Sequence, residues 1–448
     1  MYRRGEVSPV EVTAGCLERI RTSEPRLNAW IMVLEEQAMV QAAEAEKALR
    51  RGEDRGPLHG VPIAVKDNFD MAGVATTCGS PIMRGHTAAE DAVAVRSLRA
   101  AGAIILGKTN LLEFAYGIVH PQFGQCNNPW NLGRTSGGSS SGSAAAVAAG
   151  IAFGSLGTDT GGSIRIPASY CGVVGLKPTY DRVSRDGVFP LSWSLDHVGP
   201  IARTAGDAAI LLAGLDEPRS GAARPVFSKA RLAGRRVGIA TEHLGDDLHP
   251  GVRSAFERAV DAVRHAKAEI REVSIPSLLY ADPALLAVIA PEATAIHEEW
   301  LRSRPGDYAE MTRAQLELGA LVPALDYVRG QRFRRKLMSE FIEAFKEVDV
   351  IISPTVAWVA PAEDPVVAGQ QGSIEARRSG PYNLTGLPAV TIPCGTAEDG
   401  LPAGLQIAGP WMSDFQVLSV AAAIEARIGW VPECPPGIAE LLTSGASQ

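Results

Sequence analysis

The stretch RTSGGSSSGSAAAVAAGIAFGSLGTDTGGSIRIPAS, residues 134–169, combines two Gly-Gly-Ser runs with a segment of small and apolar residues between them. The first run supplies three consecutive serines, Ser139, Ser140 and Ser141, and the second supplies Ser163. The alanines between the runs predict a helix over residues 143–149, because Ala has the best helix propensity. The apolar residues that follow predict a short buried strand over residues 151–156.

The second run, Gly161-Gly162-Ser163, is suited to a sharp backbone bend. Glycine tolerates dihedral angles that other residues avoid, so successive N–H groups in such a bend can point to one side. A concavity of N–H groups binds a negatively charged oxygen. A serine inside it, Ser163, is therefore a candidate nucleophile.

Three other interpretations of this stretch compete with that one. Composition alone favours a flexible linker, but the runs bracket apolar structure and Asp159 lies just before the second run. A phosphate-binding loop is excluded because no Gly-Lys-Ser/Thr follows. Residues 138–142 fit the G-x-S-x-G nucleophile elbow with Ser140 at its centre, but that motif needs a strand before it. The polar residues 127–134 predict a loop there.

A second informative stretch is GVPIAVKDN, residues 60–68. Its run of apolar residues predicts a strand buried on both faces, with Lys66 at the carboxyl end, where α/β sheets place their ligands. The alternative is a lysine that extends to solvent. Lys108, which follows the strand predicted over 103–106, is a second and weaker candidate base. The pair Asp196-His197 could serve a Ser–His–Asp mechanism, although a simple loop pair is favoured.

Composition limits the class of protein. The chain has 448 residues, 46% of them hydrophobic, and a net charge of −7 without long runs of one sign. This argues against a nucleic acid as the main partner. The six cysteines form no CxxC pair, so neither a zinc site nor a disulfide framework is indicated.

No signal peptide or membrane-spanning apolar run is predicted, so the expected location is the cytoplasm. A helix signal begins at Ser8, close to Met1, which is compatible with a missing N-terminal segment.

Helical and strand patterns alternate along the whole chain, with no repeat and no separating linker. This predicts one layered α/β domain over residues 1–448. Residues 283–346 read as mostly helical and carry no motif.

Taken together, these stretches resemble the amidase signature family. The similarity covers nearly the whole chain and is strongest in three segments: GVPIAVKDNFDMAGVATTCGS (60–80), GGSSSGSAAAVAAGIAFGSLGTDTGGSIRIPASYCGVVGLKPT (137–179), and NLTGLPAVTIPCG with GLPAGLQIAG (383–395 and 400–409). The resemblance implies an α/β fold with a central mixed sheet of about eleven strands covered by helices on both faces. It also implies a signature core over about residues 60–205 and a variable substrate-shaping region over about 283–346.

The resemblance further implies a Ser–Ser–Lys triad. Lys66 is expected as the base, Ser139, preceded by a cis peptide bond, as the bridging serine, and Ser163 as the nucleophile. The backbone N–H groups of residues 160–163 (Thr160, Gly161, Gly162 and Ser163) are expected to form the oxyanion hole. Supporting roles are expected for Ser140, Asp159 and Arg165. No metal or cofactor is expected, because a neutral lysine can activate the serines.

The leading functional hypothesis is an amidase that cleaves a small or aryl amide, with a carbamate or urea-type bond open as a variant of the same chemistry. A second hypothesis is the glutamine-hydrolysing component of a tRNA-dependent amidotransferase. Against it, Ser413 stands where those proteins carry an Asp that binds the substrate amine, and only Arg313 is a loose candidate for their carboxylate-binding Arg. A third hypothesis is a non-catalytic binding or scaffold protein, which the intact triad argues against.

The expected partner is a small-molecule substrate, with no nucleic acid and no membrane, and the family resemblance suggests a homodimer. Residues 116–128 and 283–346 are expected to shape the substrate pockets.

Overall fold

The computed structural model describes residues 1–216, 227–228, 230–363, 375–397, 400–431 and 434–444. Its core is an eleven-stranded mixed sheet with the order β1-β3-β2-β6-β8-β7-β12-β13-β11-β9-β10. The strands are β1 (Trp30–Val33), β2 (Pro62–Lys66), β3 (Ile104–Thr109), β6 (Gly154–Asp159), β7 (Val174–Lys177), β8 (His197–Ala202), β9 (Arg236–Ala240), β10 (Glu269–Val273), β11 (Val350–Pro354), β12 (Ala389–Thr396) and β13 (Pro402–Ala408). The expected fold class is confirmed.

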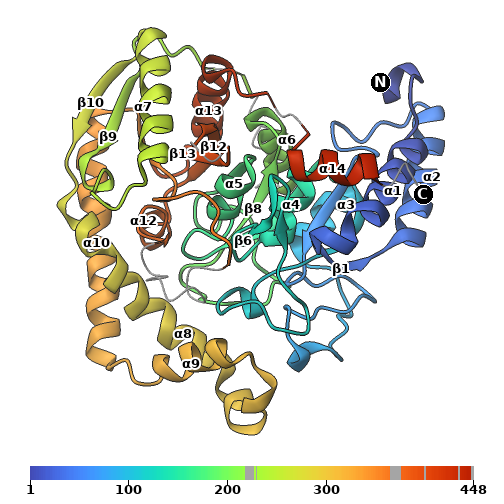
Figure 1. Ribbon diagram of the computed structural model, residues 1–448, viewed down its shortest axis with the longest axis horizontal. Helices are drawn as coiled ribbons and strands as arrows, with labels where there is room; N and C mark the ends of the chain where they lie inside the picture. The colour runs from blue at the N-terminus through green and yellow to red at the C-terminus, as the bar shows by residue number, and fades with distance from the viewer. Residues whose placement is uncertain (217–226, 229, 364–374, 398–399, 432–433, 445–448) are drawn as a thin grey trace.

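The α-helices lie around this sheet (Figure 1). They are α1 (Pro9–Leu27), α2 (Glu35–Arg50), α3 (Val93–Ala100), α4 (Ser141–Ala148), α5 (Arg165–Cys171), α6 (Ala205–Leu215), α7 (Pro250–His265), α8 (Ala281–Ser303), α9 (Glu310–Gly319), α10 (Ala324–Glu347), α12 (Gly380–Thr385), α13 (Asp414–Ile428) and α14 (Pro436–Ser444). Helices α1 and α2 lie at one end of the sheet and α7 at the other, while α8, α9 and α10 form a layer at its lower side in the view of Figure 1.

Both faces of the sheet are buried, and the alternation of side chains along each strand decides which helices they meet. In β2, Ile63 and Val65 belong to the core that includes α3, α6, α7 and α13. Ala64 between them belongs to the opposite core, with α1, α2 and α4. Strands buried on both faces read as continuous apolar runs, and β2 is predictable from the sequence for this reason.

Strand β2 pairs in parallel with both β3 and β6. The carboxyl ends of parallel neighbours lie at the same edge of the sheet, so Lys66 at the end of β2 comes next to Thr158 and Asp159 at the end of β6. The bend of residues 160–163 begins directly after β6. This pairing brings the two sequence segments that carry the predicted triad to one edge.

Several local predictions need correction. The strand predicted over 151–156 begins only at Gly154, because the N–H groups of Ile151 and Ala152 bond to Ala146 O and close the end of α4. Residues 127–134, predicted as loop, lie largely in a two-stranded hairpin of β4 (Asn127–Asn128) and β5 (Asn131–Thr135). Lys108 lies inside β3 rather than beyond its end.

One helical segment passes a test of length and apolar composition for crossing a membrane. The helical stretch Pro276–Ser303 is long and apolar enough to cross a membrane by length and composition alone, with a mean hydropathy of 1.3. In this structure it packs against α9, α10 and α12, and 44% of its most apolar window is buried inside the fold. It therefore packs as part of the layer formed by α8, α9 and α10.

Candidate active site

The side chain of Lys66 is completely buried where β2 ends. Its Nζ donates hydrogen bonds to Ser139 Oγ at 2.8 Å and to Thr158 Oγ1 at 2.8 Å. Burial lowers the pKa of Lys66 to about 7, although Asp159 and Asp196 partly oppose that shift. A lysine with this pKa is substantially neutral near pH 7 and can accept a proton.

Ser139 lies just before α4, and the peptide bond between Gly138 and Ser139 is cis, as expected from the family resemblance. Its neighbour Ser140 is fully buried and connects the two halves of the site. Ser140 Oγ donates to Thr158 O at 3.1 Å, and Ser140 N donates to Ser163 O at 3.1 Å. Ser140 thus has the contacts of a structural residue, since its hydroxyl holds the end of β6 and its N–H holds the backbone of residue 163.

Ser163 lies in the bend that leads from β6 into α5, and it lines the same cavity as Ser139. Its hydroxyl makes no hydrogen bond to any described residue. The backbone N–H groups of residues 160–163 likewise find no acceptor within the described part of the chain. These donors remain free to bind an oxygen atom that enters the cavity.

Gly162 explains why this bend needs glycine. Its φ angle is +147°, and a Cβ atom at this position would lie 2.3 Å from Ser379 Oγ. Ser379 Oγ in turn donates to Gly161 O at 2.6 Å, so it fixes the bend from outside the signature segment.

Beneath the bend, Asp159 and Arg165 form a buried ion pair. Arg165 Nε and Nη2 each donate to the Asp159 carboxylate at 2.9 Å, and both side chains are 0% exposed. Burial alone would raise the pKa of Asp159, but the Arg165 guanidinium outweighs it and holds that pKa well below its usual range. This pair brackets residues 160–163, so it fixes the two ends of the bend.

Residues distant in sequence also bind the Arg165 side chain of this ion pair. Arg165 also donates to Ser379 O at 2.9 Å, to Gln406 Oε1 at 2.7 Å and to Asn383 Oδ1 at 2.7 Å. Sequence reasoning assigns no role to Asn383 or Gln406. They do lie in the stretches NLTG and GLQ, which carry part of the family resemblance.

The other candidates of the sequence lie elsewhere. Lys108 is ion-paired with buried Asp67 at 2.7 Å. Asp196 accepts hydrogen bonds from Thr160 Oγ1 at 2.7 Å and from the N–H groups of residues 191 and 192, whereas His197 begins β8. No hydrogen bond joins Asp196 to His197 in the described residues, so the structure favours the interpretation without a Ser–His–Asp role. Asp196 instead orients the side chain of Thr160.

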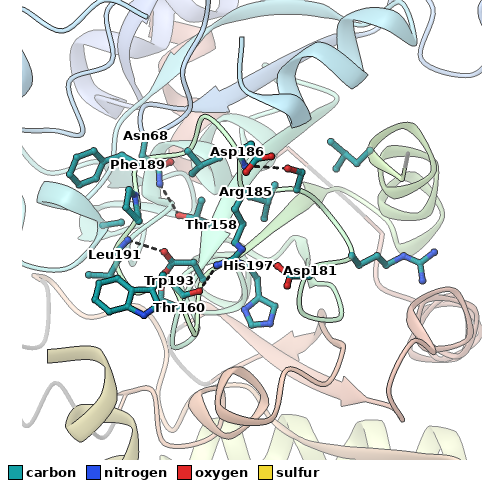
Figure 2. Close-up of a pocket in the computed structure, with 18 residues that line it drawn as sticks. Asn68, Thr158, Thr160, Asp181, Arg185, Asp186, Phe189, Leu191, Trp193 and His197 are labelled. Carbon is teal, nitrogen blue, oxygen red and sulfur yellow. Dashed lines mark hydrogen bonds and ion pairs between the residues drawn. The ribbon is translucent and has the colours of Figure 1, made fainter. Parts of the chain in front are cut away.

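Two cavities meet at Thr160. The first has a volume of about 1030 Å³, contains Ser139 and the bend 160–163, and is bounded by α8, the 320–323 turn and α10. The second, of about 630 Å³, is lined by both polar and apolar residues. The polar ones include Thr158 and Asn68, whose hydrogen bond is shown in Figure 2. Ala115, Thr160 and Leu191 line both cavities. Ser139 and the bend 160–163 therefore open into the first cavity, whereas Thr158, which binds Lys66, lines the second.

Comparisons with known proteins agree with this geometry. The family model described as Amidase matches residues 11–418. An amidase of Pseudomonas putida is 42% identical over 98% of this chain and 96% of its own length. The A component of the glutamyl-tRNA(Gln) amidotransferase of Methylococcus capsulatus is 39% identical over 98% of this chain and 97% of its own. Among solved structures, an inhibitor-bound vestigial protein complex, described as revealing the evolutionary origins of an s-triazine catabolic enzyme, superposes with a TM-score of 0.89, at 33% identity over 96% of this chain and 97% of that one. The chain belongs to the amidase family and is a hydrolase of the carbon–nitrogen bonds of amides.

Proposed function

We propose that this enzyme is a stand-alone amidase that cleaves neutral small or aryl amides through an acyl-enzyme on Ser163. The observation that carries the proposal is the 2.8 Å contact between buried Lys66 Nζ and Ser139 Oγ beside a bend of free N–H groups that contains Ser163. A serine hydroxyl is a weak nucleophile until a base removes its proton, and this contact supplies the base.

The proposed acylation step moves one proton along two serines. Neutral Lys66 accepts the proton of Ser139, and Ser139 accepts that of Ser163 as Ser163 Oγ forms a bond to the carbonyl carbon. The carbonyl oxygen becomes an oxyanion, and the free N–H groups of residues 160–163 stabilise it. Each such donor contributes roughly 3–4 kcal/mol to transition-state stabilisation.

Collapse of the tetrahedral intermediate breaks the carbon–nitrogen bond. The leaving nitrogen takes a proton from Ser139, which recovers one from Lys66. Water then attacks the ester of Ser163 and gives its proton to the same relay, so that the acid and free Ser163 are released. No hydrogen bond joins the hydroxyls of Ser139 and Ser163 in this structure, and catalytic contacts of this kind often tighten only when substrate binds.

The amidotransferase alternative needs a site for the charged ends of glutamine. Among the described residues that line the Ser163 cavity, Arg329 is the only cation, and its guanidinium is paired with Asp326 at 3.0 Å. Neither Arg313 nor Ser413 lines this cavity. Arg313 instead lies 3.5 Å from Glu317, and Ser413 Oγ donates to Pro410 O at 2.6 Å. These contacts favour a neutral amide over glutamine.

A carbamate or urea-type bond is an alternative substrate for the same mechanism, because the oxyanion and the leaving nitrogen would occupy the same places.

We further propose that residues of about 60–205 supply the chemistry and that residues 283–346 shape the specificity for substrate. In support, α8 and α10 line the Ser163 cavity. A cytoplasmic location and a homodimer, both suggested by the sequence, are left as proposals for cell fractionation and light scattering.

A substrate comparison tests the proposal. Purified enzyme is assayed with acetanilide, a phenyl carbamate, phenylurea and glutamine, each with wild type and Ser163→Ala. We expect kcat/KM for acetanilide to exceed that for glutamine by a factor on the order of 100 or more, and to vanish in Ser163→Ala, because the cavity offers no unpaired cation for a carboxylate. Turnover of glutamine above that of every neutral compound would support the amidotransferase hypothesis, and a folded protein inert to all of them would support the binding-protein hypothesis.

A further inference from the structure

Much of the wall of the cavity that contains Ser163 is apolar. Three helices and a turn from the 283–346 region supply it, with Leu285 and Ile289 on α8, Leu318 on α9, Leu321 and Val322 in the turn, and Phe333 on α10. Apolar walls of this kind bind apolar ligand groups because they remove them from water. The reactive serines therefore face a surface that favours hydrocarbon.

This apolar wall continues to the outside of the protein. Leu286, Leu318 and Leu321 all line the cavity, yet they are 46%, 62% and 75% exposed. Single exposed leucines are ordinary, but several that share the wall of one cavity form an apolar surface of the sort that marks a binding site. The exposed leucines extend the cavity wall beyond the space that surrounds Ser163.

The charged groups of the cavity are already occupied by partners within the protein. Asp282 is paired with Arg377 at 3.0 Å, and Asp326 with Arg329 at 3.0 Å. Glu375 accepts a hydrogen bond from Tyr170. In the described part of the lining, no charged side chain is left to select a charged substrate.

The size of the cavity also favours a substrate with a large apolar group. Pockets that enclose drug-sized ligands measure about 300–1,000 Å³, and this one measures about 1030 Å³. An amide with a short acyl group and a small amine would fill only part of it. The neighbouring cavity of Figure 2 is smaller, at about 630 Å³, and its lining mixes apolar residues with charged ones, including Asp181, Arg185 and Asp186.

We propose that the preferred substrates are amides that carry an extended apolar group, either a medium-length alkyl chain or an arylalkyl group. The amide carbonyl lies in the bend 160–163, and the apolar group follows α8 toward Leu318 and Leu321. This inference rests on the proposed function, because it assigns the reacting carbonyl to the Ser163 cavity. It adds the chemical class of the substrate and two residues that determine specificity.

Two homologous series test the proposal. One varies the acyl chain of a p-nitroanilide from two to twelve carbons, and the other varies the N-alkyl chain of an acetamide over the same range. Burying one methylene contributes about 0.8 kcal/mol, which corresponds to about a fourfold gain in kcat/KM. We expect a gain of roughly twofold to fourfold per methylene over several carbons in one of the series, and the series that responds shows which side of the amide bond occupies the apolar wall.

Surface variants locate the effect. Leu318→Ser and Leu321→Ser should each lower kcat/KM for the best long-chain substrate by about fivefold or more, and should lower kcat/KM for the acetyl p-nitroanilide by a much smaller factor. Leu279→Ser is the matched control, because Leu279 is 67% exposed but does not line the cavity. It should change neither substrate. Because all three positions are exposed, the variants should fold, and thermal melting checks this.

Flat profiles in both series, with Ser163-dependent turnover of the acetyl p-nitroanilide intact, would overturn the inference and leave the proposed function standing. Equal losses in the Leu321→Ser and Leu279→Ser variants would also overturn it. A third outcome would also overturn it: both profiles are flat, the enzyme binds phosphatidylcholine vesicles, and Leu321→Ser abolishes that binding. The leucines would then be assigned to a lipid-binding surface instead. Absence of turnover on every amide would contradict both the inference and the proposed function.

Discussion

Lys66 Nζ lies 2.8 Å from Ser139 Oγ, and the two side chains belong to residues that are 0% and 1% exposed. The contact joins residues 73 positions apart, one at the end of a strand and the other just before a helix. It arises because β2 and β6 are parallel neighbours and because Ser140 ties the Ser139 segment to the end of β6. The proposed chemistry follows from this close contact between a buried lysine and a buried serine.

The pKa of Lys66 predicts how activity depends on pH. Only neutral Lys66 can accept a proton, so kcat/KM should rise with pH through about 7 and level off above about 8. Lys66→Arg keeps the side chain charged and should lower kcat/KM at every pH by about 10²–10⁴-fold, the usual contribution of a general base. A pH–rate profile across the neutral range measures both effects. A profile without a rise near neutral pH would contradict the assignment.

The same pKa has a consequence for stability that needs no substrate. An unfolded lysine titrates near 10.4, so between about pH 7 and 10.4 the unfolded chain binds more protons at this residue than the folded chain. Lys66 should therefore make the free energy of unfolding rise with pH over that range. Lys66→Met should lack this contribution, which urea unfolding at several pH values measures as a flatter pH dependence than that of wild type. Identical slopes in the two proteins would show that Lys66 is not neutralised on folding.

Ser139 should matter more for amides than for activated esters. An amine must be protonated as it leaves, whereas p-nitrophenolate leaves without a proton, so Ser139→Ala should reduce anilide turnover by about 10²–10⁴-fold and p-nitrophenyl acetate turnover much less. Steady-state kinetics on both substrates provide the measurement. Ser141→Ala is the control, since Ser141 Oγ bonds only to Asn110 O at 3.3 Å among the described residues, and it should affect both substrates little. Equal losses on ester and anilide in Ser139→Ala would argue against a role as proton donor.

Arg165→Met should both destabilise the protein and impair catalysis. It leaves the Asp159 carboxylate buried without its partner, which typically costs about 3–5 kcal/mol in the free energy of unfolding, and it frees one end of the bend 160–163. Urea unfolding and kcat record the two effects. Arg264→Met is the control: it removes an exposed pair with Asp261, in which both side chains are more than half exposed, and should change stability by less than about 1 kcal/mol. Similar stability losses in both variants would contradict the importance of the buried pair.

Gly162→Ala should greatly reduce activity because its Cβ would meet Ser379 Oγ at 2.3 Å and Ile166 Cδ1 at 2.7 Å. Either clash must move the N–H groups that are proposed to hold the oxyanion. The double variant Gly162→Ala/Ser379→Ala removes the nearest contact and should recover part of kcat. Full activity of the single variant would mean that the geometry of residue 162 is not needed for catalysis.

Local sequence patterns predict some parts of this structure well and others poorly. The apolar run before Lys66 suffices to place β2, and the capping box at Ser8 places the start of α1. The prediction that residues 151–153 belong to a strand is wrong, because a short apolar run does not show whether it joins a sheet or closes a helix. The helix α5 escapes prediction, since it has seven residues and Pro167 stands within it.

Some residues of the site can likewise be predicted from the sequence, and others cannot. Lys66, Ser139 and Ser163 can be named from motifs, and the structure places Lys66 against Ser139 and both serines in one cavity. Thr158, which also binds Lys66, stands in a small-residue strand that gives no signal for such a contact. Asn383 and Gln406 reach Arg165 across 218 and 241 residues, and no local pattern reports a pairing at that distance. The exposed leucines near residue 320 likewise become informative only when the cavity they border is known.

Covalent labelling tests most directly which residue is the nucleophile. The enzyme is treated with a fluorophosphonate, and the modified peptide is located by mass spectrometry in wild type, Ser163→Ala and Lys66→Met. We predict one adduct on Ser163, its absence in Ser163→Ala, and a labelling rate in Lys66→Met that is lower by about 100-fold or more. An adduct on Ser139 or Ser140, or undiminished labelling in Lys66→Met, would contradict the proposed relay from Ser163 through Ser139 to Lys66.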